Sequence, residues 1–305
     1  MAQHPVTCTV KCALDEATRR LTAAGRTDTP RLDAEVLLAF VLGWSRARLL
    51  AHWDEAIPEA EVATFAASVD RRASGEPVAY IRNLKEFMGL DLHVDARVLI
   101  PRPETELLVE RAIVVAPQGA SVADVGTGSG AIAVALLAAR PDLRLYATDV
   151  SAAALQVARE NAARHRPTVT RTEDAQAILP ALLHGSLLEP LPEPVDLVVA
   201  NLPYLTHDEL DRLAGTSIDF EPRCALDGGP DGLDLFRALF RQLSAKLKPA
   251  GTVLLEIGAE QARAIVALAP ELDFTLHTDL AGLPRVLEGA WRSAAPLLPQ
   301  RERAG

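Results

Sequence analysis

Three glycines stand at alternate positions in the segment DVGTGSG, residues 124–130. Glycine adopts backbone conformations that other residues avoid, so this pattern predicts a tight turn that a ligand can approach closely. Gly126, Gly128 and Ala131 also match the spacing of dinucleotide-binding turns. Alternate glycines are equally common in turns that bind S-adenosylmethionine, and a purely structural turn is the third interpretation. The turn alone leaves all three open.

An acidic residue, Asp149, follows about 20 residues later, at the end of a predicted strand over residues 143–148. A carboxylate at such a position can accept hydrogen bonds from both hydroxyls of a ribose. Its alternative role is to cap the helix that begins after Ser151. Asp149 therefore favours a nucleoside ligand over a structural turn, but it does not separate the two cofactor classes.

The segment Asn201-Leu202-Pro203-Tyr204 follows an apolar strand predicted over residues 195–200. The carboxyl end of a strand in a doubly wound sheet is where ligands bind. The Asn201 side-chain carbonyl and a main-chain carbonyl, that of Leu202, can accept the two N–H groups of a planar amine or amide. Tyr204 can stack on the flat group. A hydride-transfer enzyme has no use for this arrangement, whereas a turn built from Asn and Pro is the structural alternative.

These segments need a parallel sheet to bring them together. Strands predicted over residues 121–125, 143–148, 195–200 and 252–257 alternate with helices, as at 131–139. This order predicts a parallel, doubly wound α/β sheet, with a polar insertion at 165–180 before a short strand near 182–184.

The preceding residues differ in pattern. Apolar residues recur at helical spacing over the first 75 residues, which predicts a bundle of about four short helices that end near Gly25, Gly43 and Gly75. Residues 78–81 and 90–94 alternate like strands, with Asn83 and Gly89 in the turns. We therefore expect a β-hairpin linker.

Composition narrows the class of protein. The chain has 305 residues, a net charge of −10, 49% hydrophobic residues and three cysteines, which indicates a folded protein in a reducing compartment. The acidic charge argues against stable nucleic-acid binding. No signal peptide, membrane span or zinc-ligand set is evident, so we expect a cytoplasmic monomer without a metal.

The motifs together resemble the HemK/PrmC family, which methylates a glutamine of peptide chain release factors. Asn201-Leu202-Pro203-Tyr204 resembles the (Asn/Asp)-Pro-Pro-(Tyr/Phe) motif of methyltransferases that act on planar nitrogens. The further matches are Tyr80-Ile81, Glu86-Phe87, Gly89-Leu90, the run IPRPETE at 100–106, Glu221-Pro222, Ala225-Leu226, Gly228-Gly229 and Asp231-Gly232-Leu233. The resemblance covers roughly residues 14–288.

The resemblance implies a Rossmann-like class I methyltransferase fold and three parts: an N-terminal helical substrate-recognition domain at 1–76, a β-hairpin linker at 77–103 and a methyltransferase domain at 104–305. It implies methyl transfer from S-adenosylmethionine, leaving S-adenosylhomocysteine, to the side-chain amide nitrogen (N5) of the glutamine in a Gly-Gly-Gln motif. The implied cofactor-binding residues are Gly126, Thr127, Gly128, Ser129, Gly130, Asp149, Ser186, Leu187 and Asn201. The implied catalytic and substrate-binding residues are Asn201, Leu202, Pro203 and Tyr204.

The chain departs from the family pattern in three places. Leu202 replaces the first proline of the motif, which predicts retained activity with a less rigid loop, because any residue offers the main-chain carbonyl. Asn83 replaces a glycine in a turn that needs a positive φ. The segment 166–180 is longer than expected.

Four functions can be weighed. The leading one is a protein-glutamine methyltransferase, and the alternative enzyme is a methyltransferase for nucleic-acid adenine or a ribosomal protein. A non-catalytic module that holds a translation factor and a nicotinamide oxidoreductase are the other two. The intact Asn201 motif disfavours both of these. His207 is the nearest candidate base, but a solvated residue at the start of a helix explains it equally.

Overall fold

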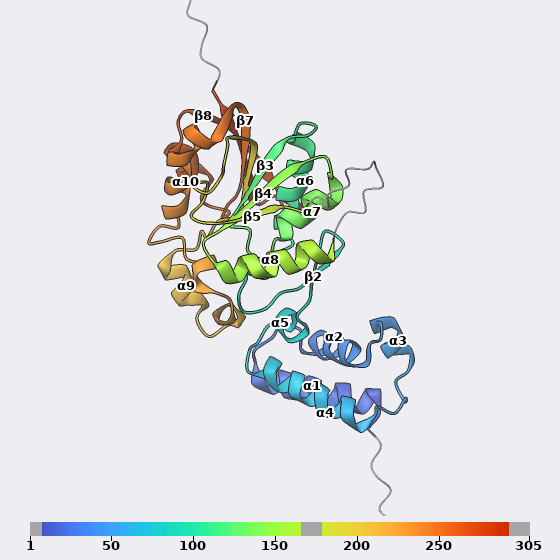
Figure 1. Ribbon diagram of the computed structural model, residues 1–305. Coiled ribbons are helices and arrows are strands. Elements are labelled where there is room, and N and C mark those ends of the chain that lie inside the picture. Colours follow the sequence, from blue (N-terminus) through green and yellow to red (C-terminus); the bar gives the residue numbers. More distant parts are fainter. Residues whose placement is uncertain (1–7, 166–178, 293–305) are drawn as a thin grey trace, which may run out of the picture.

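Short helices build the first part of the chain in the computed structural model, which describes residues 8–165 and 179–292 (Figure 1). They are α1 (Val10–Ala24), α2 (Pro30–Leu42), α3 (Arg46–Ala51) and α4 (Glu59–Ala73). Their apolar faces pack Leu14, Leu37 and Val69 into one buried cluster. The prediction of about four short helices is confirmed, and Gly25 and Gly43 end α1 and α2 in the left-handed conformation.

The expected strand at 78–81 is wrong, because Val78–Arg82 forms a short helix, α5. Asn83 has the predicted positive φ, 50°, but its N–H donates to the carbonyls of Ala79 and Tyr80, so it ends a helix rather than forming a hairpin turn. A run of four apolar residues does not distinguish a strand from a buried helical turn. Two neighbours in α5 pack in different directions, Ile81 into the helical cluster and Tyr80 against the segment that follows.

The hairpin itself is short. Strand β1 (Lys85–Phe87) pairs antiparallel with β2 (Leu90–Leu92). The two-residue turn between them has positive φ at Met88 and at Gly89, as the twist of a tight hairpin requires. The hairpin and the extended residues after it connect the helices to the sheet (Figure 1).

A seven-stranded sheet forms the larger part of the described chain, in the order β5-β4-β3-β6-β7-β9-β8. Its parallel strands are β3 (Ser121–Val125), β4 (Arg144–Asp149), β5 (Ala181–His184), β6 (Val195–Ala200) and β7 (Leu247–Glu256). Strands β8 (Leu272–Thr278) and β9 (Pro284–Trp291) complete it, with β9 antiparallel to both neighbours. The predicted doubly wound α/β sheet is thus confirmed, with a mixed edge.

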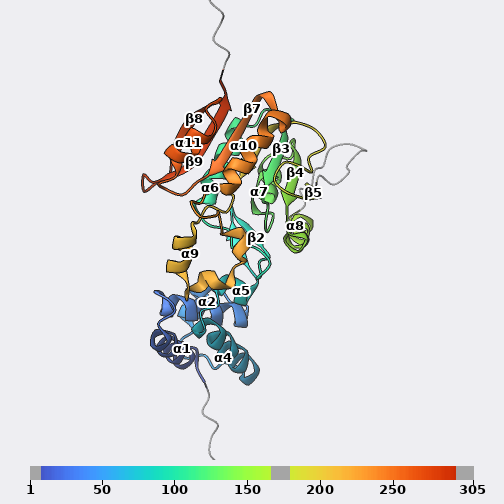
Figure 2. The ribbon, with the colours of Figure 1, turned by 90° about the vertical axis from the view of Figure 1, so that its left-hand side faces the viewer.

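Helices cover both faces of this sheet (Figure 2). One face packs against α6 (Thr105–Val115) and α7 (Ala131–Ala139), and α8 (Ala152–Arg164) lies beside them. The other face packs against α10 (Asp234–Lys246) and α11 (Ala262–Leu268). Alternate side chains of β3 show the division, because Val122 enters the first cluster and Ala123 the second.

The segment between β6 and α10 lies between the sheet and the N-terminal helices (Figure 2). It holds α9 (His207–Leu213) and two short 3-10 helices, Ser217–Phe220 and Arg223–Ala225. The Arg26 guanidinium donates to the carbonyl of Gly215, so this segment contacts the helical part directly. Among the described helices, none is long and apolar enough to cross a membrane.

Candidate functional site

The sheet reverses its direction of growth between β3 and β6. These strands are neighbours and parallel, with Val125 opposite Ala200, yet the chain leaves them toward opposite edges. Ligands of open α/β sheets bind at such a switch point, beyond the carboxyl ends of the strands. The glycine-rich turn follows β3 and Asn201 follows β6, so both predicted segments meet there.

The glycine-rich turn has the conformation that its sequence predicts. Gly126, Gly128 and Gly130 all have positive φ, and the N–H groups of Gly126 and Thr127 both donate to the Thr148 carbonyl at 2.9 Å. A Cβ at Gly130 would lie 3.0 Å from the Cβ of Ala158 in α8, so this glycine also permits close helix packing. Ser129 is buried, and Gly126 and Gly128 are the turn residues that line a cavity.

A fully buried carboxyl group, that of Asp124, stabilises the glycine-rich turn. Its Oδ2 accepts hydrogen bonds from the Thr127 hydroxyl at 2.6 Å and from the Ala133 N–H at 3.1 Å. Burial raises the pKa of Asp124 to about 7. No role for Asp124 follows from the sequence alone, although the residue stands two positions before the first glycine. Asp124 joins the end of β3 to the start of α7.

Asp149 ends β4 and lines the same cavity as the turn. Its Oδ2 accepts from the Gly128 N–H at 2.9 Å and its Oδ1 from the Ser151 N–H at 2.8 Å. A carboxylate has about four lone-pair directions, so each oxygen retains capacity for a further donor. The Ser151 hydroxyl caps α8, and the cap therefore does not need Asp149.

The segment 201–204 is held in place by contacts with distant parts of the chain. The Asn201 Nδ2 donates to the Thr105 hydroxyl at 3.1 Å, and within the described residues its Oδ1 accepts no hydrogen bond. The Leu202 side chain is buried in the core cluster that also contains α10, so packing restrains this position where a proline ring would otherwise do so. The Gln261 side chain donates to the Tyr204 carbonyl at 2.9 Å.

A glycine loop packs directly against the same backbone. A Cβ at Gly228 would lie 2.8 Å from the Pro203 carbonyl oxygen and 2.8 Å from the Tyr204 Cα. The Gly228 N–H donates to the Leu205 carbonyl at 2.8 Å, and the Leu205 N–H to that of Leu226 at 3.0 Å. Gly228, which the sequence presents only as part of a matching run, thus packs directly against the segment 201–204.

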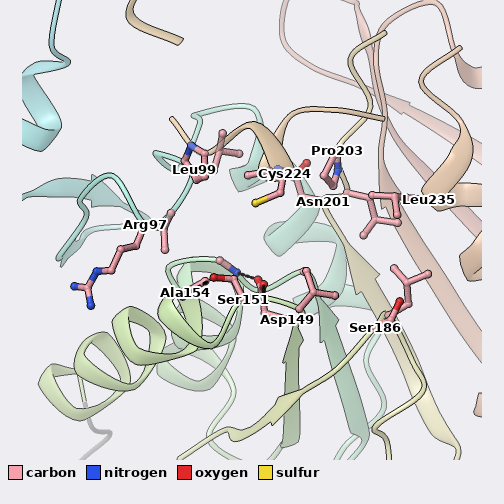
Figure 3. Close-up of a pocket in the computed structure, with 18 residues that line it drawn as sticks. Arg97, Leu99, Asp149, Ser151, Ala154, Ser186, Asn201, Pro203, Cys224 and Leu235 are labelled. Carbon is pink, nitrogen blue, oxygen red and sulfur yellow. Dashed lines mark hydrogen bonds between the residues drawn. The ribbon is translucent and has the colours of Figure 1, made fainter. Parts of the chain in front are cut away.

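Two cavities adjoin at this segment, and Figure 3 shows residues that line the first of them. The first cavity, of about 730 Å³, contains Gly126, Gly128 and Asp149 in its wall. The second cavity, of about 610 Å³, contains Arg102, Tyr204 and Glu256. Residues that line both cavities are Leu99, Asn201, Leu202, Pro203 and Ala225. Asn201 is therefore placed to contact an occupant of either cavity.

Ser186 and Leu187, in the loop after β5, also line the first cavity. Leu187 has a φ of 52°, which is uncommon for a bulky residue, and the Thr148 hydroxyl donates to its carbonyl at 2.8 Å. Both residues therefore line the same cavity as Asp149, where the sequence predicts a contact with a nucleoside. The part of the expected insertion at 166–178 lies outside the described residues.

Residues of the linker close the first cavity on the side that faces the N-terminal helices. Arg97, Val98 and Leu99 line it, and none of them was singled out from the sequence. The Tyr80 hydroxyl of α5 donates to the Val98 carbonyl at 2.6 Å. Burial raises the pKa of Tyr80 above its usual range. This hydroxyl therefore remains a neutral donor that holds the linker against the sheet domain.

Glu221, whose role the sequence left unknown, ties the linker to the loop after α9. It is buried, its Oε2 accepts from the Ile100 N–H at 3.0 Å and its Oε1 forms an ion pair with Arg102. Pro222 and Cys224 of this loop line the first cavity. Asp231 instead pairs with Arg237, outside the linings of both cavities.

His207 lies outside both cavity linings. It begins α9, is half exposed, and its Nε2 lies 3.2 Å from Asp227 Oδ1. The structure thus places the candidate base beside a carboxyl group at the surface. Tyr204, in contrast, is partly buried beside the second cavity, and burial together with Glu256 raises its pKa to about 12.

Comparisons with known proteins match both parts of the chain. A family model described as the PrmC N-terminal domain matches residues 13–82, and one described as the methyltransferase small domain matches residues 103–220. A release factor glutamine methyltransferase of Moorella thermoacetica is 44% identical over 264 residues, which are 86% of this chain and 89% of that protein. One of Koribacter versatilis is 40% identical over 285 residues, 92% and 98% of the two chains.

A solved structure is also similar. The release factor-specific protein-(glutamine-N5) methyltransferase of Alicyclobacillus acidocaldarius is 30% identical, with 63% of this chain and 93% of that chain covered and a TM-score of 0.37. The methyltransferase domain match and the observed sheet agree with the expected Rossmann-like methyltransferase fold.

Proposed function

This chain belongs to the release factor glutamine methyltransferase family, and on that premise we propose that it methylates the side-chain amide nitrogen (N5) of the glutamine in the Gly-Gly-Gln motif of peptide chain release factors. The methyl donor is S-adenosylmethionine and the product is S-adenosylhomocysteine. The observation that carries the proposal is the position of Asn201 in the shared wall of two adjoining cavities. One cavity suits a nucleoside cofactor and the other a small planar acceptor.

The first cavity contains the hydrogen-bonding groups that the donor needs. Asp149 would accept the ribose hydroxyls, with both carboxylate oxygens already held by the Gly128 and Ser151 N–H groups. The turn at 126–130 allows close approach of the methionine part, and Ser186 with Leu187 would border the adenine. When bound, S-adenosylmethionine supplies an electrophilic methyl group.

The acceptor needs orientation more than it needs a base. An amide nitrogen is a weak nucleophile because its lone pair is delocalised. The Oδ1 of Asn201 and the main-chain carbonyl of Leu202, neither of which accepts a hydrogen bond within the described residues, would receive the two N–H groups of the substrate. Two such acceptors aim the nitrogen lone pair toward the first cavity and stabilise the positive charge that develops on the nitrogen.

The second cavity would hold the glutamine side chain. Tyr204 borders it with a neutral phenol, because burial keeps its pKa far above neutrality. Pro203 and Leu99 add apolar surface to this cavity. These residues support the proposal of a substrate that presents a small planar amide.

The rest of the release factor would be held by the N-terminal part. Gly-Gly-Gln is small and neutral, so affinity must come from other surfaces. The helices of residues 8–76 are connected to the sheet through the linker and lie apart from it (Figure 2), and linker residues line the first cavity. Because the chain carries a net charge of −10, a protein partner suits it better than nucleic acid.

The test is methyl transfer with competing acceptors. The full chain is incubated with S-adenosylmethionine labelled in the methyl group and, in separate reactions, with release factors, ribosomal proteins, tRNA and DNA. We expect label in release factors at the Gly-Gly-Gln glutamine, and its loss when that glutamine is replaced. Label in nucleic acid or ribosomal protein alone, or in no acceptor, refutes the proposal.

Within the same assay, Asn201→Ala tests the shared wall. Transfer should fall at least a hundredfold while calorimetric affinity for S-adenosylmethionine falls much less, because the variant removes an acceptor for the substrate amide. Turnover within about tenfold of the unmodified chain would remove Asn201 from the role proposed here.

A further inference from the structure

A buried carboxyl group lies behind Asn201 and has no part in the mechanism so far. Glu256 ends β7, is 2% exposed and borders the second cavity together with Asn201. Its Oε2 has no hydrogen-bond partner among the described residues. Burial of a carboxyl group without full pairing is costly, so its presence at this position calls for a function.

The orientation of the Asn201 side chain decides whether it can serve the substrate. An amide has an acceptor oxygen at one end and a donor nitrogen at the other. The Nδ2 donates to the Thr105 hydroxyl at 3.1 Å, so Oδ1 is left for an incoming N–H group. If the amide were turned over, its NH2 would face the substrate amide, and two donors would meet.

The Thr105 hydroxyl can hold this orientation only if its own proton points elsewhere. Thr105 is buried at the first residue of α6, and its neighbours include the Glu256 carboxyl group. A hydroxyl group has a single hydrogen. If the carboxylate takes that hydrogen, the Thr105 oxygen is left as an acceptor, and it selects the NH2 end of Asn201.

We propose that Glu256, acting through Thr105, is a positioning residue that fixes which end of the Asn201 amide faces the acceptor substrate. This inference rests on the proposed function. The ionised carboxylate accepts from Thr105, Thr105 accepts from Asn201 Nδ2, and Asn201 Oδ1 accepts from the substrate. If Glu256 is protonated, it can donate to Thr105, whose hydrogen is then free to bind Oδ1 and turn the amide over.

Both protonation states are accessible near neutral pH. Burial raises the pKa of Glu256 to about 7, and Glu104 acts in the same direction. Arg285, Thr105 and Asn201 act in the opposite direction. The ionisable groups that share the second cavity with Glu256 are Arg102 and Tyr204. Activity should therefore decline as pH falls below about 7, as Glu256 gains its proton.

Substitutions at the two positions separate orientation from mere packing. Thr105→Val and Glu256→Ala should each lower kcat about tenfold or more, with little change in the dissociation constant of S-adenosylmethionine. Thr105→Ser should recover most of that loss, because it keeps the hydroxyl. Glu256→Gln cannot ionise, so the ratio of rates at pH 8 and pH 6 should approach one. Glu35→Gln, at another buried glutamate, in the N-terminal helices, should leave the ratio as in the unmodified chain.

A second measurement does not depend on methyl transfer. A carboxyl group whose pKa is raised in the folded state makes the fold less stable as pH rises from its ordinary value of 4.5 to the folded value of about 7, and the loss is complete above that pH. The unmodified chain should therefore lose more thermal stability between pH 6 and pH 8 than Glu256→Gln does. If release factors take no methyl group, the proposed function fails, while this unfolding profile still tests the ionisation of Glu256.

Three results would overturn the inference. The first is Glu256→Ala or Thr105→Val with kcat within threefold of the unmodified chain. The second is Glu256→Gln with an unchanged pH ratio. The third is an identical pH dependence of unfolding in Glu256→Gln and the unmodified chain.

Discussion

Replacing Gly228 with alanine should displace the segment that would hold the substrate amide. A Cβ at this position would lie 2.8 Å from the Pro203 carbonyl oxygen, 2.8 Å from the Tyr204 Cα and 2.9 Å from the Gly232 Cα. All three are backbone atoms, which cannot move aside by changing rotamer. Gly228 has no positive φ, so the substitution acts through this contact alone.

The size of the displacement follows from these distances. Ordinary contacts of a Cβ begin at 3.4 Å, so the backbone at 203–204 must move by about half an ångström. Misplacement of a reacting group by about 1 Å can reduce a rate about 10²-fold. Half that movement therefore predicts a kcat about tenfold lower, which corresponds to about 1.4 kcal/mol in the barrier. Overpacking should also cost about 1–3 kcal/mol of stability.

The assay measures single-turnover methyl transfer to a release factor at saturating S-adenosylmethionine, with denaturant unfolding of the same samples. Gly289→Ala is the matched control, because it also lacks a positive φ and its Cβ would meet the Phe274 side chain at 2.7 Å, away from both cavities. We expect the control to lose stability while its kcat changes little. A Gly228→Ala variant that folds and turns over within twofold of the unmodified chain would refute the supporting role of this loop.

Three further substitutions test other contacts of the site. Asp149→Ala should weaken S-adenosylmethionine binding at least tenfold by calorimetry, since the ribose loses its acceptor, and an unchanged dissociation constant would reject that assignment. Tyr80→Phe leaves the buried Val98 carbonyl without its donor and should lower the free energy of unfolding by about 1–3 kcal/mol in urea; a change below about 0.3 kcal/mol would show that the hydroxyl does not hold the linker. Glu221→Gln removes the charge paired with Arg102 and should lower stability by about 1–3 kcal/mol, with a dependence on salt smaller than in the unmodified chain, whereas equal salt dependence would contradict a stabilising ion pair.

Much of the fold could be predicted from patterns among neighbouring residues in the sequence. The strand at β3, the glycine turn and the helix α7 follow one another as the sequence predicts, because each depends on neighbouring residues and on glycine's access to positive φ. The Ser151 cap of α8 is equally local. The same reasoning failed at Val78–Arg82, where burial on two sides outweighed a four-residue alternation.

The sequence by itself predicted which residues would carry the chemistry: the turn at 126–130, Asp149 and Asn201 could be named because their residue types and spacing follow predicted strands. Only the tertiary structure decided what surrounds them. It placed Asn201 in the wall of two cavities. It also brought Thr105 and Glu256, which are far apart in the chain, close to the Asn201 side chain. Hydrogen bonds and burial between distant segments leave no periodicity in a single sequence, because they depend on how the strands are ordered in space.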